Sequence, residues 1–171
     1  MKRLFIAFLV LVSLILEISF FPNFKFFGVI PNIFLMLILA FLFILPEKYT
    51  FYSAFWGSLI LGLFSNILLG SESLVIIFLL LILILSHNYI FTSINYFLLV
   101  FFSFFVTLFY DLLLLIFYKI VGYRTDFIYF LKTGFLFQIL INGVLVLVLY
   151  FLVNHFWDNL VKKEERSRLL R

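Results

Sequence analysis

Residues 51–70, FYSAFWGSLILGLFSNILLG, form an apolar run of about membrane length in which small residues concentrate. Four positions at i+4 spacing form one narrow ridge on a helix: Ala54, Ser58, Gly62 and Asn66. Because lipid is as apolar as leucine, membrane helices associate through close backbone approach and interhelical hydrogen bonds. The stretch therefore predicts a helix over 51–69 that forms the packing centre of the fold. Its ridge is expected to face other helices, with Asn66 as its strongest polar group.

The composition indicates an integral membrane protein. Of the 171 residues, 67% are hydrophobic and only 12% are charged, and the mean hydropathy is +1.31. Soluble domains are about half apolar and a quarter charged. The chain has no cysteine, which excludes disulfides, thiolate metal sites and cysteine nucleophiles. The net charge of +4 is concentrated at the two ends, which bears on membrane topology rather than on nucleic-acid binding.

We predict an all-α polytopic membrane protein, one domain over residues 1–171 with six transmembrane helices. The predicted spans are 4–21, 29–45, 51–69, 74–91, 95–121 and 130–156, followed by a charged tail over 157–171. The basic start and short first apolar run are typical of a signal peptide, but no small-x-small cleavage site follows, so we expect a retained helix. The fifth span would be about 40 Å long as a helix and must tilt, bend or protrude.

Six spans place both termini on the same side of the membrane. Eight of the twelve Lys and Arg residues then lie on the terminal side, and Lys25, Lys119, Arg124 and Lys132 lie opposite. Cytoplasmic loops carry the excess of Lys and Arg, so both termini are predicted to be cytoplasmic.

Several polar residues interrupt the predicted spans. Counting 1.5 Å per residue from each helix start places Glu17, Asn66 and Asp111 in the outer half of the membrane. Intramembrane polar groups usually face the bundle interior or a water-filled cavity. We therefore expect Glu17, Asn66, Asp111 and Asn142 to converge in an outward-opening polar cavity between helices one, three, five and six. The structural or interaction candidates are Glu17, Asn32, Ala54, Ser58, Gly62, Asn66, Asp111, Gln138 and Asn142.

These polar residues also have purely structural interpretations. Glu17 lies within about one turn of Pro22 and has the length to reach the headgroups. Asn66 fits a hydrogen bond between helices as well as a ligand contact, and Asp111 fits a pair with another buried polar group. On this interpretation the polar residues are separate helix-packing contacts.

Catalytic motifs are absent from the sequence. It contains no HExxH, no GxSxG, no glycine-rich phosphate loop and only two histidines. We therefore expect neither an enzyme nor a cofactor or metal site.

The order of the motifs resembles the rod shape-determining protein MreD family. Ile30-Pro31-Asn32 opens the second span, where that family has Pro-Asp or Pro-Asn. Gly57-x4-Gly62-Leu63-x2-Asn66, followed by Gly70, resembles the family's Gly-x4-Gly-Leu-x2-Asp and outer turn. Ile141-Asn142-Gly143 stands where an apolar residue followed by Asn is common. Two positions depart from the family pattern, because Asn66 replaces the usual Asp and Glu17 stands where Gln is frequent.

This resemblance implies a non-enzymatic scaffold of the bacterial cell-elongation (rod) complex, acting in cell shape and lateral peptidoglycan synthesis. The implied partners are membrane lipids, MreC, the MreB filament and the wall synthases. The implied location is the bacterial cytoplasmic membrane, and no nucleic acid or small-molecule ligand is expected.

Two alternatives remain open at this point. The family is also similar to the substrate-binding S-components of energy-coupling-factor vitamin transporters, which implies their fold and a small-solute capture function. S-components typically carry Ala-x3-Ala on the first helix, and here Ala7 is followed by Leu11. A holin-like pore would need a continuous polar stripe, whereas the polar groups of this chain stop at mid-depth.

Overall fold

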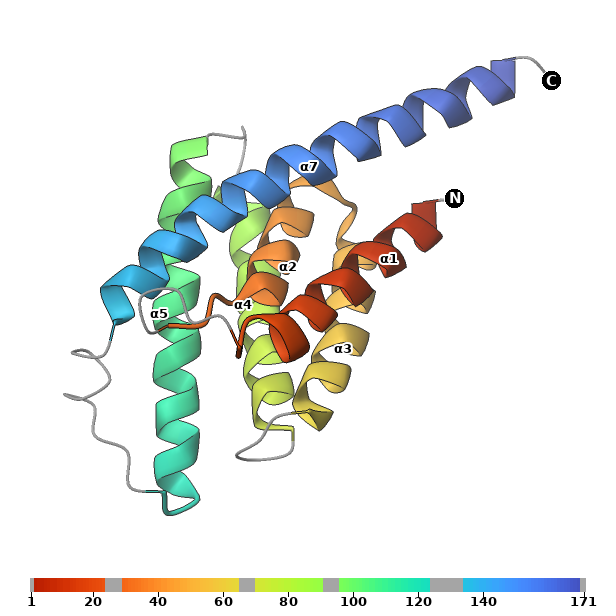
Figure 1. Cartoon of the computed structure of the whole chain (residues 1–171). Helices are drawn as coiled ribbons and strands as arrows, with labels where there is room; N and C mark the ends of the chain where they lie inside the picture. Colours follow the sequence, from red (N-terminus) through yellow and green to blue (C-terminus); the bar gives the residue numbers. More distant parts are fainter. Residues whose placement is uncertain (1, 24–28, 65–69, 91–95, 124–133, 170–171) are drawn as a thin grey trace.

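The computed structural model describes residues 2–23, 29–64, 70–90, 96–123 and 134–169, with the backbone alone for 86–90 and 163–169 (Figure 1). This part of the chain is all-helical, as predicted. Its elements are α1 (Lys2–Ile15), the π-helical turn η1 (Leu16–Phe20), α2 (Ile33–Ile44), α3 (Glu47–Leu63), α4 (Ser71–Ile90), α5 (Tyr96–Ile120) and α7 (Phe135–Leu169).

The helices form an upright group crossed by two oblique helices. Figure 1 shows α3, α4 and α5 running side by side, with α1 and α7 passing obliquely across the face where α2 lies. The most extensive contacts are those of α7 with α2 and α5, and of α3 with α4. The start of α1 and the end of α7 extend to the same side of the molecule (Figure 1).

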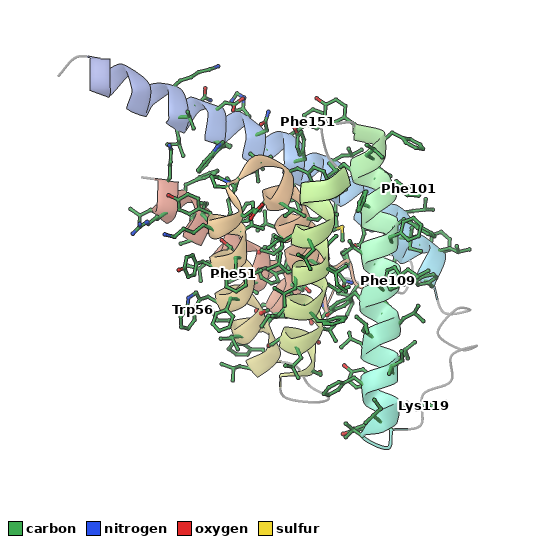
Figure 2. All side chains as sticks on the ribbon, turned by 180° about the vertical axis from the view of Figure 1, so that it is seen from behind. Phe51, Trp56, Phe101, Phe109, Lys119 and Phe151 are labelled. Atoms are coloured by element: carbon green, nitrogen blue, oxygen red, sulfur yellow. The ribbon has the colours of Figure 1, made fainter. Side chains whose placement is uncertain are left out.

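The packing centre is α2, and the prediction that the stretch 51–70 forms it is wrong. The sequence of α2, IFLMLILAFLFI, has no polar residue, and every position from Ile33 to Phe43 is buried. A helix that is apolar all round needs protein or lipid on every side, and here protein surrounds it. α3, in contrast, exposes a face that carries Tyr52, Trp56 and Leu63 (Trp56 is labelled in Figure 2).

The small-residue ridge of α3 nevertheless faces the protein. Ala54 and Ser58 are fully buried, and Gly62 is buried at the contact with α4. Ser73 Oγ of α4 donates a hydrogen bond to the Ser58 carbonyl oxygen at 2.5 Å. A Cβ atom built on Gly62 would overlap Ser73 Oγ, so glycine is what permits this approach of α3 to α4.

Several helix bounds differ from the predicted spans. α2 begins at Ile33, four residues after the predicted start at 29. α3 begins at Glu47 and ends at Leu63, short of the predicted 69. α7 continues through the predicted tail to Leu169. The tail is rich in Leu, Lys, Glu and Arg and lacks Pro and Gly, so falling hydropathy marks a change of surroundings there and not a helix end.

Within the part of the chain that the structure describes, three helical stretches are long and apolar enough to cross a membrane: Lys2–Phe20, Tyr96–Ile120 and Phe135–Lys162. The apolar helices Ile33–Ile44 and Ser71–Leu85 are shorter. As a helix of twelve residues, α2 is about 18 Å long, against a hydrocarbon core of about 30 Å. The chain therefore has the character of a membrane protein, and the count of six spans stays a prediction.

Substituting Gly62 should distinguish this close contact from an ordinary one. In Gly62→Ala the new methyl group displaces Ser73 Oγ and its hydrogen bond, so the free energy of unfolding should fall by about 1–3 kcal/mol. Gly143→Ala is the matched control, because its Cβ would meet only ordinary contacts, 3.5 Å from Val100 and 3.7 Å from Ser103. Unfolding in detergent micelles measures both; equal losses would contradict the close approach of α3 to α4.

Candidate functional site

The amino end of α2 begins inside the bundle, where its free N–H groups need partners. Pro31 is buried and has no N–H to satisfy. Asn32, at the N-cap position, makes no side-chain capping bond. Two other elements supply the missing acceptors. The Phe34 N–H donates to Glu17 Oε2 at 2.6 Å, and the Asn32 N–H donates to Asn142 Oδ1 at 3.1 Å.

Glu17 acts as a helix cap contributed by a different helix. It lies in η1, where the π-helical turn Leu16–Phe20 ends the first helix. A carboxyl oxygen at a helix amino terminus satisfies an N–H group as a capping side chain does. The snorkelling interpretation of Glu17 is therefore wrong, since its side chain is half-buried and bonded to the α2 backbone.

Asn142 links three helices. Its side chain is fully buried on α7, its Oδ1 accepts the Asn32 N–H of α2, and its Nδ2 donates to Thr107 Oγ1 of α5 at 3.0 Å. Both ends of the amide are thus used within the protein. An amide bonded at both ends in an apolar interior fixes the relative positions of the helices that it joins.

Asp111 and Gln138 lie one helical turn further along the same interface. Asp111 follows Thr107 by four residues on α5, and Gln138 precedes Asn142 by four on α7, so the two pairs stack along antiparallel helices. A side-chain hydrogen bond joins Gln138 to Asp111. Asp111 Oδ2 is buried without a hydrogen-bond partner, as is Asn32 Nδ2.

The predicted polar residues therefore fall into two groups. Glu17, Asn32 and Asn142 meet in a network at the start of α2, and Asp111 and Gln138 lie one turn further along the contact of α5 with α7. Ala54, Ser58 and Gly62 belong to the separate contact of α3 with α4. Asn66 lies outside the described residues.

The network gathers around α2, a helix that the expected cavity between helices one, three, five and six did not include. The nearby groove on α7, about 470 Å³ in volume, is apolar. It is lined by Phe21, Pro31, Phe137, Leu140, Ile141, Val144 and Leu145.

Thr107 is the member of the network that sequence reasoning missed. The signal was present, because Ser103, Thr107 and Asp111 recur every four residues in an otherwise apolar helix and form the buried polar stripe of α5. Threonine and serine are common in membrane helices, so a stripe becomes informative only when its spacing is examined.

No group of three or more His, Asp or Glu side chains that could hold a metal ion occurs among the described residues. Comparison of the chain with protein-family models, curated proteins and solved structures gives no match.

Removing the Asn142 amide should destabilise the fold. Asn142→Leu leaves the Asn32 N–H and the Thr107 hydroxyl without their partner, so the free energy of unfolding should fall by about 1–3 kcal/mol. A double-mutant cycle with Thr107→Val should give a coupling energy of about 0.5–2 kcal/mol. Asn159→Leu, at an exposed position of the same helix, should change stability by less than about 0.5 kcal/mol. Additive losses in the cycle would contradict the bridge.

Proposed function

We propose that this chain is a non-enzymatic membrane scaffold of the bacterial cell-elongation complex, of the kind represented by the MreD family. The proposal rests on the ordered motifs at Pro31-Asn32, Gly57 to Asn66 and Asn142-Gly143. It places the chain in the bacterial cytoplasmic membrane with both termini in the cytoplasm. MreC, MreB and the wall synthases are the proposed partners.

The observation that carries the proposal is the way in which the intramembrane polar groups are used. The side chains of Glu17 and Asn142 both accept hydrogen bonds from backbone N–H groups at the start of α2, and Asn142 Nδ2 donates a hydrogen bond to Thr107. Side chains committed in this way stabilise a bundle and are not available to hold a solute. A rigid bundle with apolar outer faces suits a protein that works through contacts with other membrane proteins.

The outer faces offer the surface that such contacts need. Leu136, Leu140 and Val144 of α7 are among its most exposed side chains, and Phe101 and Phe109 of α5 point outward in Figure 2. Lipid or the transmembrane helices of partner proteins can cover this surface equally well, since its chemistry is the same for both.

One observation favours vitamin capture as the second candidate function. Asp111 Oδ2 is buried without a partner beside Gln138, which is the kind of group that a small polar solute would satisfy. The scaffold is preferred because the neighbouring polar groups Glu17 and Asn142 are already bonded within the protein.

Loss of the chain should change cell shape. In the rod-shaped bacterium that carries the gene, its deletion should produce rounded cells, and the wild-type chain should restore rods and co-purify with MreC. Asn142→Leu should restore rods poorly, and the control Asn159→Leu should restore them fully. Unchanged shape after deletion would contradict the scaffold. A saturable thermal shift with a vitamin, lost in Asp111→Leu, would favour capture instead.

The side of the membrane on which each end of the helices lies can be measured by cysteine labelling, because the chain has no cysteine of its own. Lys119 and Asn159 are exposed. Lys119 lies at the end of α5, and the carboxyl-terminal part of α7 projects from the opposite side of the molecule (Figure 2). In intact cells a membrane-impermeant thiol reagent should label Lys119→Cys and should label Asn159→Cys only after permeabilisation. The reverse pattern would place the termini outside the cell.

A further inference from the structure

The end of α7 continues beyond the membrane-length part of the helix. From Phe135 to Val153 the helix is apolar apart from Gln138 and Asn142, and this part is about 28 Å long, close to the thickness of the hydrocarbon core. The helix then runs on to Leu169 through polar residues. Both figures show this end projecting obliquely past the other helices.

An aromatic cluster marks the level at which α7 leaves the hydrocarbon. The ring of Trp157 lies 6.2 Å from that of Tyr49, at the start of α3, and Lys2 Nζ lies 5.3 Å from the Trp157 ring. Phe156 contacts Phe5 of α1 at 5.7 Å between ring centroids. Tryptophan and tyrosine favour the membrane–water interface, so the starts of α1 and α3 and this part of α7 meet at headgroup level.

Basic residues gather directly beyond this cluster. Arg3, Lys48 and Lys162 are exposed. Two acidic residues in this region, Glu47 and Asp158, are also exposed, and the basic residues Lys2, Arg3, Lys48 and Lys162 outnumber them by two.

We propose that this basic collar, formed by Arg3, Lys48 and Lys162, binds the headgroups of anionic phospholipids. Each Lys or Arg near an anionic surface strengthens binding about fivefold. The position of the collar, next to an interfacial Trp–Tyr pair, selects lipid over an acidic protein partner. An acidic protein partner would also require basic residues, but it would not require them to lie at the level of the lipid headgroups.

A lipid titration of the purified full chain tests the proposal. The chain in neutral detergent is titrated with phosphatidylglycerol and, separately, with phosphatidylcholine of the same acyl chains, and bound lipid is counted by native mass spectrometry. The wild-type chain should prefer phosphatidylglycerol, and raising the salt concentration should reduce that preference. The variant R3Q/K48Q/K162Q should lose at least about tenfold in affinity for phosphatidylglycerol.

Three variants separate the charge effect from a folding defect. R3K/K48R/K162R keeps every charge and should keep the preference. Lys119→Gln, at the far end of α5 in Figure 2, should bind phosphatidylglycerol as the wild-type chain does. If the triple variant fails to fold, Lys162→Gln alone should weaken binding about fivefold. Equal affinity for the two lipids, or unchanged binding by the glutamine variants, overturns the proposal; capture of an acidic protein without a lipid preference does so too.

Discussion

The structure depends on one constraint, which is that the first N–H groups of α2 must find acceptors in an interior that holds little water. An unpaired backbone N–H buried in apolar surroundings costs on the order of 1–3 kcal/mol. α2 meets the constraint with a proline that has no N–H, a carboxyl group from η1 and an amide from α7. The polar residues that look out of place in the sequence of a membrane protein are the acceptors that allow an uninterrupted apolar helix to begin inside the bundle.

This constraint also explains how the bundle acquires a single arrangement. α2 is apolar on every face, so its apolar contacts alone do not select one rotation about its axis or one depth in the membrane. Hydrogen bonds at its amino end do select both, because Glu17 and Asn142 reach specific backbone atoms. The contact of α3 with α4 follows a different rule, since Gly62 and the Ser73–Ser58 bond fix the separation of these helices.

The sequence predicts the helical membrane character, the inward orientation of Ala54 and Ser58, and the importance of Glu17 and Asn142, because each depends on composition or on local spacing. It does not predict that α2 is central. An apolar run has the same composition whether lipid or protein surrounds it, so burial cannot be read from it. The predicted end of the last span at 156 is wrong for a similar reason. α7 continues from apolar into polar sequence without a Pro or Gly that would end the helix. Partners such as Asn32 and Asn142 are distant in sequence, and only the tertiary fold brings them together.

The span of the Asn32–Asn142 bond has a consequence for biogenesis. The two residues are 110 positions apart, and Asn142 lies on α7, which is synthesised after α2. When α2 has been synthesised, Asn142, which accepts the Asn32 N–H, has not yet been made. The hydrogen bonds at the start of α2 are therefore completed only after α7 has been synthesised. A chain interrupted before α7 leaves the Asn32 N–H, at the start of the central helix, without its acceptor.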